Sequence, residues 1–241
     1  MLAIHTFAHA ALRTWDSGGA DDNWSTPQNW VGDVAPVAGD DLLFPTGARM
    51  GPMNDFPAGT TFNSIIFSAG NNTLDGNPIT PNAGLLATNG VDNRIWCPPV
   101  LNSNQTFQFS FSSGNFYLPA TIDLNGNDLT FDLLSGAVIQ VQAVISGTGA
   151  IIRTGIGSVS LHASNTFTDP VQLLQGTTTI YNSGALGSTN GNTTLAAGAY
   201  LNLANPITVA EPLVLSANLV SIGGGAKAWN ACRPPLEQTI S

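Results

Sequence analysis

The sequence predicts an all-β protein, a right-handed parallel β-helix (solenoid) with a tryptophan-rich N-terminal cap segment. Three observations predict this fold. Short segments in which apolar and polar residues alternate recur through residues 139–203, without a helical period. Runs of glycine, asparagine and serine separate these segments and supply corners with positive φ, whereas two-residue hairpin turns are scarce. Charge is also rare, because Arg153 and Asp169 are the only charged residues between 133 and 210 apart from His162.

Strands this short cannot each bury a face alone. In a parallel β-helix, each coil buries its inward residues against the coils above and below it. An antiparallel sandwich also contains short alternating strands and is the alternative fold. In the solenoid, the alternation places Val141, Leu161, Leu173 and Ile180 in one inward row of the core.

The order of small motifs within residues 143–203 is also informative. The motifs are Gly147-Thr-Gly149, Val159-Ser-Leu161, Asn165-Thr-Phe167, Gln175-Gly176-Thr177, Gly184-Ala-Leu-Gly187 and Gly198-Ala-Tyr-Leu201. In this order they resemble the autotransporter-associated β-strand repeat, also called the passenger-associated transport repeat. Two positions depart from that pattern. Thr168-Asp169-Pro170 stands where the family usually has Thr-Gly-Gly, and Thr177-Thr178 stands where it has Thr-Leu.

The resemblance implies a non-enzymatic passenger domain that is secreted or held at the cell surface of a bacterium, outside the outer membrane. Its β-helix would be a rigid stalk that presents other parts, and its stacking would support passage through that membrane. Two other classes stay open. One is a carbohydrate-active β-helix enzyme, either a polysaccharide lyase or a glycosidase. The other is a glycan-binding module that uses the tryptophan-rich segment.

The domain boundaries follow from changes along the chain. Residues 15–222 are expected to form a single β-helix domain, with 15–59 as its cap segment and 143–203 as the passenger-type repeat. Residues 1–14 contain Ala8-His9-Ala10, which fits a signal-peptide cleavage pattern, so they are either a signal-peptide remnant or an opening strand. We expect the solenoid to end near Ile222, because the glycines and prolines of residues 223–241 indicate an irregular tail.

The cap segment contains three of the five tryptophans, Trp15, Trp24 and Trp30. Indole rings stack on the flat faces of sugars, so these residues are candidates for glycan binding. The competing interpretation is that they close the exposed end of the solenoid core, which has to be protected from strand addition. The second interpretation is favoured by the sequence.

The same segment is rich in aspartate, and carboxylates could gather around Ca²⁺. The candidates are Asp16, Asp21, Asp22, Asp40 and Asp41. Their spacing matches neither an EF-hand loop nor a calcium-binding β-roll repeat. We therefore expect aspartates in solvated turns and no metal site.

Residues 107–133 contain a phenylalanine row and the candidate catalytic acids. Phe107, Phe109 and Phe111 alternate with polar residues, which predicts an inward row. Asp128 and Asp132 are an even number of residues apart, so they would share a strand face, as the carboxylate pairs of β-helix glycosidases do. Turn formation explains Asp128 better. Convergence of three or more of Asp123, Asp128, Asp132, Asp169 and Arg153 would favour an enzyme.

Little in the sequence indicates nucleophilic catalysis, a disulfide or a bound cofactor. His162 lies on the outward face by alternation, without a nucleophile elbow anywhere in the chain. Cys97 and Cys232 are far apart and belong to no metal-binding motif, so we expect them to be unpaired and no cofactor to be held.

Composition narrows the range of partners. The 241 residues carry a formal net charge of −9 with only six lysines and arginines, which argues against nucleic acid and anionic membranes. No apolar run is long enough to span a bilayer. A surface glycan or another cell-surface protein stays open as a partner.

Overall fold

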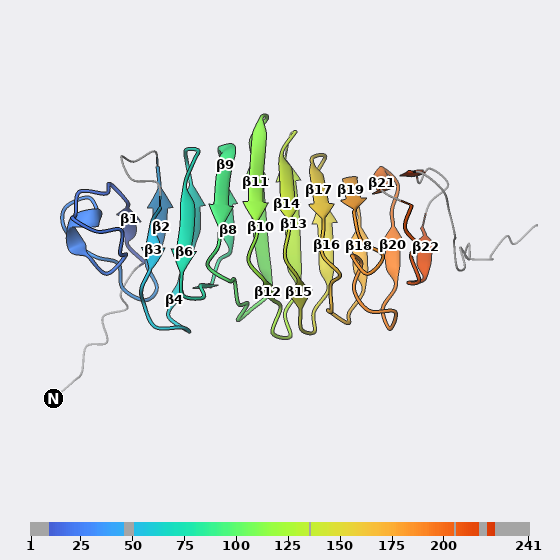
Figure 1. The fold of residues 1–241 in the computed structure, drawn as a ribbon, viewed down its shortest axis with the longest axis horizontal. Coiled ribbons are helices and arrows are strands. Elements are labelled where there is room, and N and C mark those ends of the chain that lie inside the picture. The colour runs from blue at the N-terminus through green and yellow to red at the C-terminus, as the bar shows by residue number, and fades with distance from the viewer. Residues whose placement is uncertain (1–9, 46–50, 135, 205, 217–220, 225–241) are drawn as a thin grey trace, which may run out of the picture.

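A computed structural model of the chain describes residues 10–45, 51–134, 136–204, 206–216 and 221–224. These residues form parallel strands stacked as a solenoid of about eight turns, without an α-helix. Figure 1 shows the stack extended along one axis, with the cap at one end and the last coils at the other. The predicted fold class is confirmed, and the antiparallel sandwich is excluded because every paired strand is parallel to its neighbour.

One long sheet contains ten strands. In spatial order they are β1 (Leu12–Thr14), β2 (Asp41–Phe44), β5 (Ile65–Phe67), β8 (Leu85–Ala87), β10 (Gln105–Ser110), β13 (Leu129–Leu134), β16 (Ile151–Thr154), β18 (Val171–Leu173), β20 (Thr193–Leu195) and β22 (Leu213–Leu215). Each strand pairs with the corresponding strand of the next coil, so the sheet runs the length of the solenoid.

The second long sheet contains nine strands. They are β3 (Met53–Asn54), β6 (Thr73–Gly76), β9 (Gly90–Ile95), β11 (Gly114–Leu118), β14 (Val138–Val141), β17 (Ser158–Leu161), β19 (Gly176–Ile180), β21 (Ala199–Leu203) and β23 (Ser221–Gly224). Two short pairs complete individual coils, namely β4 (Thr61–Phe62) with β7 (Thr80–Pro81), and β12 (Ile122–Asp123) with β15 (Ile145–Ser146).

The core lies between the sheets and follows the predicted alternation. Val141, Leu161, Leu173 and Ile180 are all buried, as expected for an inward row. The phenylalanine row of β10 is buried too, and aromatic contacts link it to neighbouring coils. Rings of Phe109 and Phe116 lie 5.1 Å apart between centroids, and those of Phe67 and Phe116 lie 5.0 Å apart. Edge-to-face contacts of this kind add specific packing to the burial of apolar area.

The Asn125-Gly126 turn shows how corners are made. Both residues have positive φ, 47° and 84°, a combination that usually closes a two-residue hairpin. Here it joins β12 to β13, and these strands belong to different sheets. Asn125 Nδ2 donates to the Leu101 carbonyl 2.9 Å away on the preceding coil. The turn therefore works as a corner between sheets, tied to the coil beneath it.

The ends of the domain differ in detail from the expected boundaries. β1 pairs in parallel with β2, so residues 12–14 are an opening strand, whereas residues 1–9 lie outside the described residues. Within residues 15–59, β2 and β3 already belong to the long sheets, which limits the cap to the part before Asp41. The sequence predicts an irregular tail from Gly223 onward, but Gly223 and Gly224 continue β23 by pairing with Asn202 and Leu203. Glycine supplies backbone donors and acceptors to a ladder even without a side chain. Residues 225–241 lie outside the described part.

Candidate functional site

The three tryptophans of the cap lie inside the protein. Trp15, Trp24 and Trp30 are each 0% exposed. Trp15 and Trp30 form an antiparallel bridge, and their rings meet edge to face at 5.3 Å between centroids. The ring of Trp24 lies 5.3 Å from that of Phe44, in the first full coil. In this arrangement no indole face is open to a glycan, and the three residues cover the end of the core instead.

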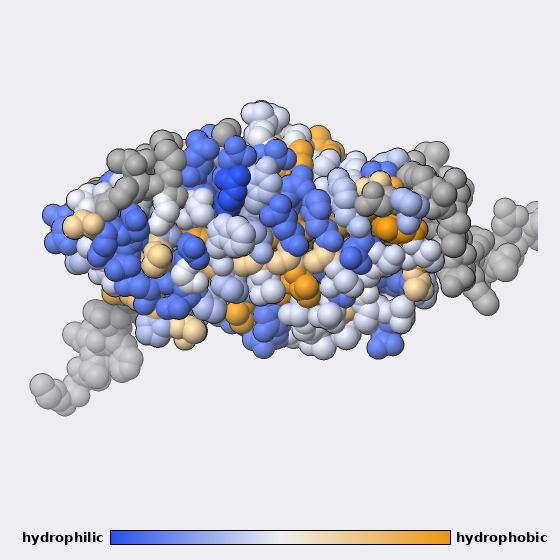
Figure 2. All heavy atoms as spheres, in the orientation of Figure 1, coloured by the Kyte–Doolittle hydropathy of each residue, from blue (hydrophilic) through white to orange (hydrophobic). Residues whose placement is uncertain are grey.

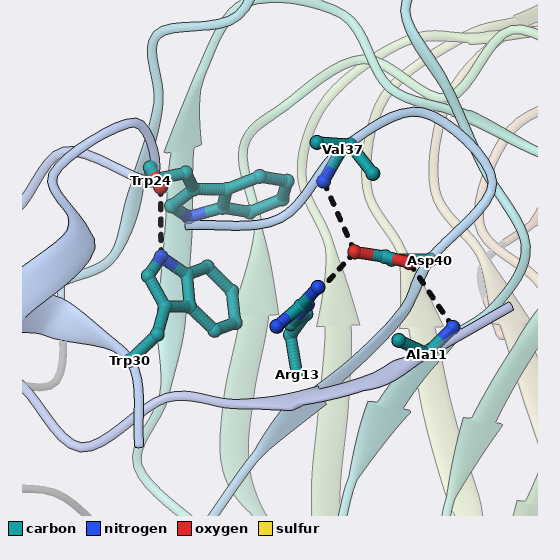
Figure 3. Close-up of polar contacts among 6 residues, drawn as sticks. All are labelled: Ala11, Arg13, Trp24, Trp30, Val37 and Asp40. Carbon is teal, nitrogen blue, oxygen red and sulfur yellow. Dashed lines mark hydrogen bonds and ion pairs between the residues drawn. The ribbon is translucent and has the colours of Figure 1, made fainter. Parts of the chain in front are cut away.

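Polar contacts fix the cap onto the first coil (Figure 3). Trp30 Nε1 donates to the Trp24 carbonyl at 2.7 Å. Asp40 accepts hydrogen bonds from Arg13 Nε at 2.9 Å and from the backbone N–H groups of Ala11 and Val37 at 3.1 Å. Burial alone would raise the pKa of Asp40, but these hydrogen bonds and the charge of Arg13 together lower it. Asp40 therefore acts as an ionised clamp between the opening strand and the loop before β2.

The other aspartates of residues 15–59 either serve local turns or tie one coil to the next. Asp21 accepts from the backbone of Asn23 at 3.1 Å and from the side chain of Thr26 at 3.0 Å. Asp41 accepts from Asn63 Nδ2 at 2.7 Å on the next coil. Among the residues that the structure describes, no three His, Cys, Asp or Glu side chains are grouped closely enough to hold a metal ion.

The candidate catalytic acids are engaged in separate contacts. Asp128 Oδ1 accepts from the Ala150 backbone N–H at 2.8 Å. Asp132 accepts from Gln108 Nε2 at 3.0 Å and from Thr154 Oγ1 at 2.9 Å, its neighbours on adjacent strands. The two carboxylates thus belong to ladders that tie coil to coil. Among the described residues, no two of the candidate carboxylates share a hydrogen-bond partner.

Arg153 lies where sequence reasoning did not expect a cation. It occupies an inward position of β16 and is 1% exposed, so it does not face an outer groove. Its guanidinium donates to the backbone carbonyls of Thr154, Gly155 and Gly157 in the following turn, with 3.0 Å to Gly155. Burial lowers the pKa of Arg153 to about 10, although the charge of Asp132 opposes this shift. Arg153 thus provides hydrogen-bond donors for the backbone carbonyls of the turn that follows β16.

His162 lies on the outside, as the alternation predicted, but it is not simply solvated. Its ring stacks on that of Tyr181 with 4.3 Å between centroids and 9° between planes. Its Nε2 is 2.7 Å from Gln140 Oε1. Partial burial lowers the pKa of His162. No described contact joins it to a serine or a carboxylate, so a catalytic triad is not assembled around it.

Two buried ionisable groups have no clear signal in the sequence. Glu211 is 4% exposed, and its Oε1 accepts from Thr193 Oγ1 at 2.9 Å while Oε2 has no partner. Burial raises its pKa to about 7. Cys97 is a buried free thiol that donates to the Asp75 carbonyl, and burial raises its pKa to about 12. Cys232 lies outside the described residues, so its pairing stays a prediction.

The outer face of the ten-stranded sheet carries a shallow hollow of about 320 Å³. It lies over β5, β8 and β10 and is lined by Ser64, Ile66, Ala83, Leu85, Leu86, Thr106 and Gln108. No ionisable side chain is among these residues. The hollow therefore offers a small apolar floor with polar edges and no general acid or base.

Comparison with known proteins points to one class. No protein-family model matches the chain, and no solved structure matches it. An adhesin autotransporter, BmaC of Brucella suis biovar 1 (strain 1330), is 30% identical over 107 residues, which is 42% of this chain and 3% of that protein. The chain thus spans a small part of the relative's length. Together with the solenoid, this similarity fits a passenger-like domain, whereas the specific repeat suggested by the motifs is not established.

Proposed function

We propose that this chain is a stalk-forming part of an autotransporter-type passenger, secreted or displayed at the bacterial cell surface, and that it acts without catalysis. The observation that carries the proposal is the parallel pairing of coil on coil, which runs from β1 to β22 in one long sheet and from β3 to β23 in the other. A stack of this kind is a rod whose length is set by the number of its coils.

Two further observations support the proposal. The chain is similar over 107 residues to a protein described as an adhesin autotransporter. The carboxylates that would have favoured a polysaccharide-cleaving enzyme are tied to neighbouring strands by hydrogen bonds. The alternative of a carbohydrate-active enzyme has no specific contact in its favour. No helix in the described part of the chain is long and apolar enough to cross a membrane.

The fold also suggests how passage through a membrane would be aided. Each coil pairs with the coil that precedes it in the sequence, as β17 pairs with β14 and β19 with β17, so it needs no partner from a more distant coil. A coil that emerges on the far side can add at once to the one already folded. Folding would then proceed from coil to coil, and the folded coils would hinder the chain from moving back through the membrane.

Surface labelling tests this function with two adjacent residues. Leu173 is 2% exposed and Leu174 is 38% exposed, so Leu173→Asp places a carboxylate in the core while Leu174→Asp leaves it in solvent. Antibodies against the folded domain should label intact cells that express the natural chain or Leu174→Asp, and label far fewer of those that express Leu173→Asp. Labelling that needs permeabilised cells, or equal display of both variants, would contradict the proposal.

A further inference from the structure

The outer face of the nine-stranded sheet differs chemically from the rest of the molecule. Its outward positions form rows in which side chains of successive coils lie next to one another, about 4.8 Å apart. One row runs Arg94, Tyr117, Gln140, Ser160, Thr179 and Asn202, from β9 to β21. A second row immediately follows the strands and includes Trp96, Gln142, His162 and Tyr181, as the backbone hydrogen bonds of these residues show.

Neither row contains a carboxylate, although the chain carries 15 acidic residues. Asp75 on β6, the strand before β9, limits this face at one end. Arg94 is the only cationic side chain in the described part of the chain that is neither buried nor ion-paired, because Arg153 is buried and Arg13 pairs with Asp40. In Figure 2, one side of the solenoid is mostly hydrophilic or intermediate in hydropathy, with hydrophobic residues in small patches. Apart from Arg94, the two rows thus consist mainly of hydroxyl, amide, imidazole and aromatic side chains, and Asp92 on the same strand as Arg94 is half-buried.

Aromatic rings lie within this face, and side-chain contacts hold those of Tyr117 and Tyr181 in place. The guanidinium carbon of Arg94 lies 4.7 Å from the centroid of the Tyr117 ring, while Nη1 donates to the Asp92 carbonyl at 2.9 Å. The stack with His162 and the contact between His162 and Gln140 fix the orientation of Tyr181. Trp96 is 48% exposed and Tyr181 is 40% exposed. Aromatic groups that are fixed before binding lose less conformational entropy when a ligand arrives.

We infer that this aromatic strip, made of Arg94, Trp96, Tyr117, Gln140, His162 and Tyr181, binds an uncharged polysaccharide that lies along the axis of the solenoid. Sugar rings present C–H faces that pack on aromatic side chains and hydroxyl groups that both donate and accept hydrogen bonds. Amide, hydroxyl, imidazole and guanidinium groups of the strip match those hydroxyls. A linear polymer would meet related side chains at every coil, so weak contacts would add along its length.

The surface fits a glycan better than a protein or an anionic polymer. Protein interfaces need an apolar centre, but the exposed aliphatic side chains of the described residues, such as Leu134, Ile156 and Leu174, lie outside the strip. An acidic polymer would be repelled by a chain of net charge −9, and Arg94, the one cation among the described residues that is neither buried nor ion-paired, does not compensate. The inference is independent of surface display, since binding can be measured on the soluble chain.

The test uses the purified chain against a panel of neutral polysaccharides, namely dextran, amylose, mannan, xylan and β-1,3-glucan, with polygalacturonate and heparin for comparison. Affinity electrophoresis or calorimetry should show binding of at least one neutral polymer, with equal affinity in low and high salt. Longer oligosaccharides of that polymer should bind more tightly than short ones. Absence of binding to every neutral polymer, or binding of the anionic polymers alone that salt abolishes, would overturn the inference.

Variants locate the site. Trp96→Ala and Tyr181→Ala should each weaken binding at least tenfold, since stacking on an aromatic group is lost, and Tyr181→Phe should retain most of it. The matched controls are Ile156→Ala and Leu174→Ala, which remove exposed side chains elsewhere and should leave affinity unchanged. Thermal unfolding of each variant shows that the solenoid is intact. If the controls lose as much affinity as Trp96→Ala and Tyr181→Ala, or if those two variants bind as well as the natural chain, the polysaccharide does not bind at this strip.

Discussion

Thr178 shows at the scale of one residue how the core tolerates a polar group. It occupies an inward position of β19 between Val159 and Leu201 of the neighbouring coils and is 2% exposed, and its Oγ1 has no hydrogen-bond partner. A buried hydroxyl without a partner costs about 1–3 kcal/mol. The autotransporter-associated β-strand repeat, which residues 143–203 resemble, usually has leucine at this position. The departure of this chain from the repeat pattern therefore lies in the core.

Replacing the hydroxyl by a methyl group should therefore stabilise the protein. We expect Thr178→Val to raise the free energy of unfolding by about 1 kcal/mol, because the shape is kept and the unpaired polar atom is removed. Chemical denaturation measures the change. Thr179→Val, on the outward face of the same strand, is the control and should have little effect. A loss of stability in Thr178→Val would show that the hydroxyl has a partner in solution.

Glu211 should make stability depend on pH. Burial raises its pKa to about 7 from a usual value of 4.5, so the folded state favours the protonated form. The contribution of Glu211 is then most favourable below pH 4.5, falls as the pH rises to 7, and is constant above that. A shift of this size corresponds to about 3 kcal/mol at most. Glu211→Gln should be more stable than the natural chain at pH 8 and similar to it at pH 4.5, as measured by denaturation at both values. A constant difference across this range would contradict the assignment.

The sequence was sufficient to predict burial for residues whose side chains agree with the alternation. It was insufficient to predict burial for residues that break the alternation. Val141, Leu161, Leu173 and Ile180 are apolar at inward positions, and their burial followed from period-two patterning. Arg153 also lies at an inward position, although the cost of burying a charge usually keeps arginine out of a core. Its compensation comes from carbonyls of a turn, and turn geometry of that kind cannot be deduced from residue order.

At the scale of elements, the cap depends on a charged clamp between non-adjacent segments. Asp40 joins Arg13 of β1, Ala11 and Val37, and its lowered pKa means that the ionised carboxylate is favoured in the folded state. That contribution is present above the usual carboxyl pKa near 4 and is lost as the pH falls through the lower folded value. Exposed ends of sheets need such protection.

Removing the clamp should loosen the cap before the rest of the solenoid. We expect Asp40→Ala to cost about 2–4 kcal/mol, because Arg13 and two backbone N–H groups lose a partly buried acceptor. Tryptophan fluorescence and limited proteolysis should report earlier opening of the N-terminal segment, since Trp15, Trp24 and Trp30 lie there. The control is Asp33→Asn, an exposed turn residue with a φ of 54° that asparagine also adopts. Equal protease sensitivity of the two variants would contradict the role of Asp40.

The strands themselves were easier to anticipate than the sheets they join. Alternation located the strands around Phe107 and Val159, but nothing in their composition assigns one to the ten-stranded sheet and the other to the nine-stranded sheet. That assignment depends on corner geometry, as at Asn125-Gly126. The tryptophans were ambiguous for a related reason, because an indole ring suits both a core and a sugar. The sequence favoured the cap, and the complete burial of the three rings agrees with it.

At the scale of the whole molecule, successive coils pair in matching register, so that one coil could occupy the place of the next. Ile151 of β16 pairs with Leu129 on one side and Val171 on the other, and all three point inward. Ala150 and Pro170 hold equivalent positions, since their carbonyls accept from Leu129 and Ile151 respectively. A solenoid stabilised by contacts between neighbouring coils should therefore accept the removal or duplication of a complete coil.

Deleting residues 151–170 joins Ala150 to Val171, so β18 takes the place of β16 beside β13. We expect a folded, cooperative protein that is shorter by about 5 Å along its long axis, and a tandem duplication of the same residues to be longer by about 5 Å. Small-angle X-ray scattering compares the two lengths, and circular dichroism the fold. Deleting only 151–160 is the control, because it removes β16 and most of β17 and joins Ala150 to Leu161, so that neither long sheet keeps a complete strand from this coil. If the complete-coil deletion unfolds as readily as the half-coil deletion, the coils are not independent units, and the length of the rod is not simply set by their number.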